Sequence, residues 1–192
     1  IEAFIHAGID NDTRVLVKWI DPESLEKSDN IENVFSNVDG ILIPGGFGDR
    51  GIEGKIMASQ YARENKIPFF GICLGLQCAI IDFTRHVCGL GNANSSEFSK
   101  KSKNTVIDLM PGQRNIKTKG ASMRLGSYIC KVKGGTKAYK AYGKRNIYER
   151  HRHRFEVNND FRKLLEDNGL VVSGENPELN LVEMIELKDH PW

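Results

Sequence analysis

The fold follows from Gly71-Ile-Cys73-Leu-Gly75-Leu-Gln77 and its two flanks. Pro68–Ile72 before it is a short apolar run typical of a buried strand, and Leu76–His86 after it has apolar residues at helical spacing. Gly-x-Cys-x-Gly between a strand and a helix is the thiol form of the nucleophile elbow, in which small residues allow a sharp turn. We therefore predict that Cys73 is a nucleophile at the carboxyl edge of a sheet.

The helix after Cys73 is expected to influence its thiol. The helix N-terminus directs N–H groups and the positive end of its dipole at the sulfur, which predicts a pKa below the usual value of about 8.5. The alternative is that Cys73 is a buried apolar residue, as most free cysteines are. We assign that structural role to Cys78, Cys88 and Cys130.

Alternation of strand and helix extends through the first half of the chain. We expect strands at Val15–Ile20 and Gly40–Ile43, and a helix at Ile52–Asn65, before the strand at Pro68–Ile72. Strands that are apolar on both faces, with helices between them, favour a parallel sheet covered on both sides. The prediction is an α/β fold with an open, mainly parallel central sheet.

After about residue 110 the pattern changes to shorter strands, which predicts added antiparallel structure in the second half. Gly112–Gly120, with little apolar content, is the best candidate for a mobile loop. The candidate strands are Ser122–Leu125, Tyr128–Val132, Ile147–Arg150 and Leu181–Leu187, and the candidate helix is Phe161–Asn168.

The composition describes one globular domain and excludes several classes of protein. The 192 residues are 40% apolar, and 27 Lys and Arg against 25 Asp and Glu leave a formal net charge of +2. This length suits a single domain over residues 1–192, and the charge balance argues against a nucleic-acid binder. The sequence has no apolar run long enough to predict a membrane span, and no signal peptide is recognised. Four cysteines without a CxxC pair predict no metal site and favour a cytoplasmic location.

The chain contains candidate oxyanion donors but no obvious base. Leu74 follows the nucleophile directly, and the glycines of Pro44-Gly45-Gly46-Phe47-Gly48 let a backbone N–H approach a ligand. A histidine base is expected for such a cysteine. Strand alternation over Glu149–Arg154 places His151 and His153 on the face opposite three arginines, one of which could bind a carboxylate. The other histidines are His6, His86 and His190.

These residues resemble the class I (triad) glutamine amidotransferases, and within that class the glutaminase domains of CTP synthases. The resemblance implies a flavodoxin-like fold and a reaction that releases ammonia from L-glutamine. It covers most of the chain in the family's order and rests on Pro44–Lys55, Gly71–Gln77, Asn92–Phe98, Met123–Gly126, Glu149–Asn159 and Asp189–Trp192.

The resemblance also implies a role for each matching residue. Cys73 would form the γ-glutamyl thioester, with the backbone N–H groups of Gly46 and Leu74 as the oxyanion hole. Glu97 would face the α-amino group of the substrate, and Arg154 its α-carboxylate. The implied substrate-binding set is Gly46, Phe47, Leu74, Gly75, Leu76, Gln77, Glu97 and Arg154, with no metal and no cofactor in this domain.

The family pattern extends beyond residues 1–192, so we expect a domain that is incomplete at both ends. The family's first strand is missing, its catalytic His-Pro-Glu is expected a few residues after Trp192, and Trp192 replaces the glutamate that His190-Pro191 would need. In this family an N-terminal synthetase domain uses ATP, Mg and the ammonia to aminate UTP, GTP stimulates the transfer, and the enzyme is a homotetramer. Two alternatives remain, namely an inactive or glutamine-binding fragment and the glutaminase of another triad amidotransferase such as GMP synthetase.

Overall fold

The computed structural model describes residues 1–99, 101–109 and 124–191. The predicted loop Gly112–Gly120 lies outside these residues, as do Ser122 and Met123 of an expected strand and Trp192. Among the helices of the described part, none is long and apolar enough to cross a membrane.

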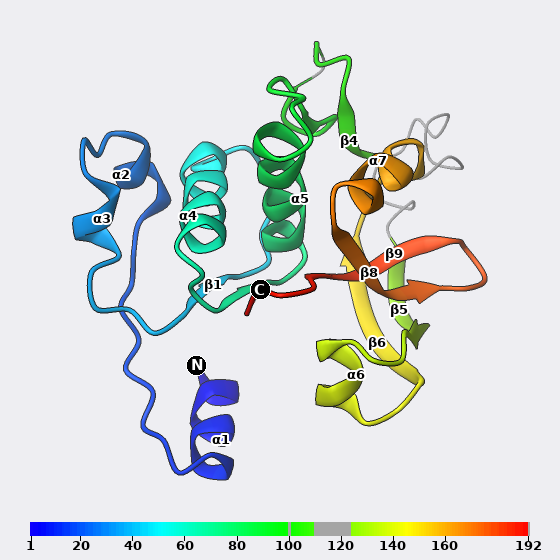
Figure 1. Cartoon of the computed structure of the whole chain (residues 1–192), viewed down its shortest axis with the longest axis horizontal. Coiled ribbons are helices and arrows are strands. Elements are labelled where there is room, and N and C mark those ends of the chain that lie inside the picture. Colours follow the sequence, from blue (N-terminus) through cyan, green and yellow to red (C-terminus); the bar gives the residue numbers. More distant parts are fainter. Residues whose placement is uncertain (100, 110–123, 192) are drawn as a thin grey trace.

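The first half contains a small parallel sheet beside two helices that pack against each other (Figure 1). β1 (Ile41–Ile43) pairs in parallel with β2 (Phe69–Gly71), which confirms the two strands predicted there. α4 (Ile52–Glu64) connects them and α5 (Leu74–His86) follows β2, so both predicted helices are confirmed, α5 starting two residues earlier than expected. The helices upstream are α1 (Glu2–Asp10), α2 (Pro22–Glu26) and α3 (Ile31–Val34).

The strand expected at Val15–Ile20 is wrong. The segment has no regular secondary structure, and its large side chains are exposed, Leu16 by 79% and Trp19 by 77%. A strand needs a neighbour to pair its N–H and C=O groups, and within the described residues the parallel sheet contains only β1 and β2. The described strands form a parallel sheet of two strands, a mixed sheet of three and an antiparallel sheet of four, rather than one mainly parallel central sheet.

The second half is largely antiparallel, as predicted. Its four-stranded sheet has the order β6-β5-β8-β9, and every neighbouring pair in it is antiparallel. In the three-stranded sheet β4 pairs in parallel with β3 and antiparallel with β7. The strands are β3 (Asn94–Ser95), β4 (Thr105–Leu109), β5 (Arg124–Val132), β6 (Asn146–His153), β7 (Phe155–Val157), β8 (Leu170–Asn176) and β9 (Leu181–Leu187), and the helices are α6 (Lys137–Tyr142) and α7 (Arg162–Asp167).

The core between the two halves is built around α5, which lies between α4 and the second-half sheets (Figure 1). Ten of its thirteen residues are buried. Ile80 and Ile81 share one apolar cluster with Ile56 of α4, Ile107 of β4 and Val172 of β8. Burial on nearly all sides makes α5 a rigid support for the cysteine at its N-terminus.

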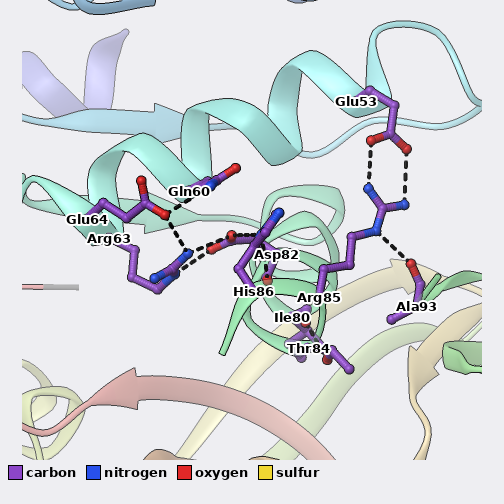
Figure 2. A network of polar contacts seen from close by, with 10 residues as sticks. All are labelled: Glu53, Gln60, Arg63, Glu64, Ile80, Asp82, Thr84, Arg85, His86 and Ala93. Atoms are coloured by element: carbon purple, nitrogen blue, oxygen red, sulfur yellow. Dashed lines mark hydrogen bonds and ion pairs between the residues drawn. The ribbon is translucent and has the colours of Figure 1, made fainter. Parts of the chain in front are cut away.

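Polar contacts also lock α5 against α4 (Figure 2). Asp82 is completely buried and accepts two hydrogen bonds from Arg63, at 2.9 and 3.1 Å, while the His86 Nδ1 lies 2.8 Å from the same carboxylate. Arg85 makes a second bidentate pair with Glu53, at 2.6 and 3.1 Å. Paired, hydrogen-bonded charges fix the relative position of the two helices and oppose sliding.

Candidate active site

The predicted elbow at Cys73 is confirmed. Cys73 follows β2 after one residue, Ile72, and is the N-cap of α5, with φ +53° and ψ −102°, a positive-φ conformation that is strained for any residue with a side chain. A Cβ on Gly71 would lie 2.5 Å from the Gly75 carbonyl carbon, and a Cβ on Gly75 would lie 2.2 Å from the Ile43 oxygen. Both positions therefore require glycine, because the turn brings backbone against backbone.

The glycine segment after β1 lies against this elbow. A Cβ on Gly45 would be 3.5 Å from the Cys73 Cβ, and one on Gly46 would be 3.2 Å from the Leu74 Cδ2. The Leu74 N–H donates to the Cys73 thiol, which lowers the pKa of that thiol. The two segments expected to supply oxyanion donors are thus neighbours in space at the nucleophile.

A cavity of about 350 Å³ opens beside Cys73. It brings together six of the predicted site residues from four separate segments, a size and composition suited to a small polar ligand. Leu74, Gly75 and Leu76 do not line it, because the two leucines pack in or against the core and Gly75 packs against Ile43. The lining residues are Gly46, Phe47, Cys73, Gln77, Glu97, Arg152, His153, Arg154 and Phe155.

Three side chains in the cavity wall have free hydrogen-bonding capacity for a ligand. Glu97 accepts the Gly48 N–H at 3.4 Å; burial raises the pKa of its carboxyl, while that N–H and Arg154 lower it. The Arg154 Nε is buried without a hydrogen-bond partner in the described part of the chain. Gln77 donates its Nε2 to the Phe155 carbonyl at 3.2 Å, and its Oε1 is buried and likewise unpartnered there. These three side chains therefore offer a ligand one acid, one guanidinium and one amide acceptor.

The expected lowering of the Cys73 pKa is wrong for this chain. Burial of the half-buried thiol raises its pKa, and Glu156 and Glu97 add to the increase, against the Leu74 N–H that lowers it. A helix N-terminus alone does not overcome the desolvation of a thiolate beside two carboxyl groups. The thiol therefore needs a proton acceptor before it can attack.

The strand alternation predicted over Glu149–Arg154 holds only as far as β6 extends. His151 and His153 are partly buried on one face, and Arg150 and Arg152 are exposed. β6 ends at His153 and β7 begins at Phe155, so the alternation is interrupted at Arg154, and His153 and Arg154 both line the cavity. The sequence prediction therefore missed His153, Arg152 and Phe155 as site residues, and the dense Arg-His pattern was the available signal.

The remaining histidines lie elsewhere. His6 is exposed, His86 contacts the buried Asp82, and the His190 Nε2 lies 2.8 Å from the Arg63 carbonyl. Within the described residues no three His, Cys, Asp or Glu side chains gather in a way that could hold a metal ion.

Comparison with known proteins identifies the family of this chain. The sequence model of the family described as glutamine amidotransferase class-I matches residues 1–192. The chain belongs to this family. Its fold is likewise similar to a solved structure, the Trypanosoma brucei CTPS glutaminase domain with bound acivicin. The TM-score is 0.89 and the identity 37%, over 97% of this chain and 73% of that one.

Curated relatives of this glutamine amidotransferase chain carry the name CTP synthase. The protein from Carboxydothermus hydrogenoformans is 59% identical over 191 residues, and that from Clostridium acetobutylicum is 58% identical over 192. Each match covers 100% of this chain and 36% of the relative. The chain thus spans little more than a third of the length of these relatives.

Proposed function

We propose that this chain is the glutaminase domain of a CTP synthase and hydrolyses L-glutamine to glutamate and ammonia through a thioester on Cys73. The observation that carries the proposal is the cavity that places Cys73 together with Glu97 and Arg154. A free amino acid offers one ammonium and one carboxylate group, and this pair of opposite charges suits both ends. The family membership and the names of the relatives support the same reaction.

The cavity residues suggest how glutamine is oriented. The α-amino group would pair with Glu97 and the α-carboxylate with Arg154, while the unpartnered Gln77 Oε1 would accept an N–H of the substrate. Gly46 and Phe47, from the glycine segment after β1, complete the cavity lining, and Leu74, Gly75 and Leu76 would contribute only through the backbone. The side-chain amide would then reach Cys73.

The chemistry assigns one task to each group at the elbow. The Cys73 sulfur attacks the amide carbon, and the Gly46 and Leu74 N–H groups stabilise the oxyanion. The C–N bond breaks, the nitrogen leaves as ammonia after taking a proton, and water hydrolyses the thioester to glutamate. Because burial raises the Cys73 pKa, the reaction needs a base. The histidine and glutamate of the family's triad, expected just after residue 192, would supply it.

The remaining parts of the proposal concern the longer protein. The released ammonia would aminate UTP in an N-terminal synthetase domain that holds ATP and Mg, with GTP as an allosteric activator, in a cytoplasmic homotetramer. The name CTP synthase, and the match to only 36% of each relative, support a synthetase domain in the longer protein. We also propose that β1 and β2 form part of a larger flavodoxin-like parallel sheet, and that residues 1–192 belong to one domain.

Labelling with a diazo-ketone analogue of glutamine tests the reaction. We expect a single adduct in the full-length protein, no adduct in Cys73→Ser, and ammonia release that is lost in Cys73→Ala. An adduct that persists in Cys73→Ser would contradict the assigned nucleophile. Comparing UTP with a purine acceptor as the ammonia-consuming substrate separates a CTP synthase from a GMP synthetase.

A glutamine-binding module without turnover is the second candidate, favoured by the raised pKa of Cys73. Isothermal titration with glutamine separates the two functions. Binding without ammonia release in the full-length protein would support the module and refute the hydrolase.

A further inference from the structure

A cluster of buried polar side chains lies behind one wall of the cavity. Arg124 of β5 is 3% exposed, and it donates to Glu183 of β9 at 2.6 Å and to Glu156 of β7 at 3.4 Å. His151 and His153 of β6 complete the cluster, with the His151 Nε2 3.5 Å from the Glu183 carboxylate. Only His153 also lines the cavity, so it connects this cluster to the site.

The contacts of the His153 ring determine which nitrogen carries its proton. Nδ1 lies 3.2 Å from the Phe155 carbonyl oxygen and 3.3 Å from the Glu156 Oε1, which also faces Arg124. A carbonyl oxygen can only accept a hydrogen bond, so Nδ1 is the donor. Burial lowers the pKa of His153 to about 4, so the ring is neutral at pH 7 and its Nε2 has a lone pair.

His151 supplies the hydrogen bond that this tautomer requires. Its Nδ1 lies 2.8 Å from the His153 Nε2 and must therefore donate to it. The direction is the same whether the His151 ring is neutral or charged, because both states can carry a proton on Nδ1. The hydrogen bonds thus run from His151 through His153 to the Phe155 carbonyl.

The Phe155 carbonyl also accepts the Gln77 Nε2 at 3.2 Å, which leaves the Gln77 Oε1 as the free acceptor of that amide. Rotating the amide would place an oxygen against the carbonyl oxygen, so this contact fixes which end of Gln77 is available. The position of Phe155 thus controls the acceptor offered to a ligand, and Arg154 precedes it directly in the chain.

We propose that His151 is a positioning residue for the glutamine pocket, since its Nδ1–H selects the His153 tautomer that holds the Phe155 carbonyl and so orients Gln77. The inference rests on the function proposed above. His151 itself does not line the cavity and acts through His153. Without its donor, His153 can take the other tautomer, whose Nδ1 lone pair would repel the Phe155 carbonyl oxygen.

Variants of His151 in the full-length protein test this inference. His151→Leu removes the donor, whereas His151→Asn places an amide N–H near the original Nδ1. The probe is the rate of Cys73 labelling as a function of diazo-ketone concentration. Loss of one hydrogen bond predicts a half-saturating concentration roughly 2- to 10-fold higher in His151→Leu, with little change in maximal rate. His151→Asn is expected to restore most of the loss. The proposal would be overturned if His151→Leu had the same half-saturating concentration as the wild type, or if His151→Asn raised that concentration as much as His151→Leu does.

The tautomer itself gives a readout that is independent of activity. Nitrogen NMR of the histidine-labelled protein is expected to find His153 protonated on Nδ1 in the wild type and as a mixture in His151→Leu. Protonation on Nε2 in the wild type would refute the inference. If His151→Leu does not fold, His151→Gln takes its place. The longer glutamine side chain puts its amide near the original Nε2 position and so leaves no donor near the original Nδ1 position. A wild type that resists labelling but has the expected tautomer would refute the proposed function alone.

Discussion

Gly75→Ala tests the physical basis of the nucleophile elbow. The added Cβ would lie 2.2 Å from the Ile43 oxygen, and ordinary contact begins near 3.4 Å, so α5 and β1 must separate by about 1 Å. The Ile43 oxygen also accepts the Ile72 N–H at 2.9 Å, and this hydrogen bond holds β1 to the start of the turn. The substitution therefore strains the support of Cys73 from both sides.

The expected cost combines three effects. Overpacking contributes about 1–3 kcal/mol and loss of the Ile72 hydrogen bond about 1 kcal/mol, while alanine at a helical position recovers about 1 kcal/mol. We expect the free energy of unfolding to fall by about 1–3 kcal/mol, measured by urea denaturation. A nucleophile displaced by about 1 Å is also expected to react up to about 100-fold more slowly with the glutamine analogue.

Gly91→Ala is the matched control for Gly75→Ala. Gly91 is exposed, and a Cβ there would meet no atom within 4 Å. This variant is expected to keep the wild-type urea midpoint and labelling rate. Gly75→Ala with the same midpoint and labelling rate as Gly91→Ala would refute the steric reasoning.

The other predictions concern the buried charges and the pocket. Asp82→Asn removes the buried negative charge that faces Arg63, whose side chain is 13% exposed, and is expected to lower the free energy of unfolding by about 3 kcal/mol in urea denaturation. The exposed ion pair of Asp167 provides the control, since Asp167→Asn should leave the midpoint unchanged. Burial raises the pKa of Glu156 from 4.5 to about 8, so the folded state retains a proton that the unfolded state has lost. The free energy of unfolding is therefore expected to fall as the pH rises from 6.5 to 8.5, and we expect Glu156→Gln to make this fall smaller. The same pH dependence in the wild type and in Glu156→Gln would contradict the raised pKa. Arg154→Met is expected to raise the KM for glutamine about 10- to 100-fold in an ammonia-release assay, and an unchanged KM would remove Arg154 from the site.

The sequence was sufficient wherever local sterics determine the outcome. Gly71 and Gly75 around Cys73 predicted the elbow, because only glycine allows this close approach of backbone segments. The apolar spacing of Ile52–Asn65 predicted α4 because helix periodicity is a local property. The family resemblance then named Glu97 and Arg154, and the cavity contains both.

Only the tertiary structure decided what depends on distant partners. Val15–Ile20 has the composition of a strand, but strand formation requires a neighbour, and the described part of the chain offers it none. The interruption between β6 and β7 put His153 and Arg154 on the same cavity, against simple alternation. The Cys73 pKa rises because burial and the charges of Glu156 and Glu97 act through space, and no spacing along the chain encodes their distance from the sulfur.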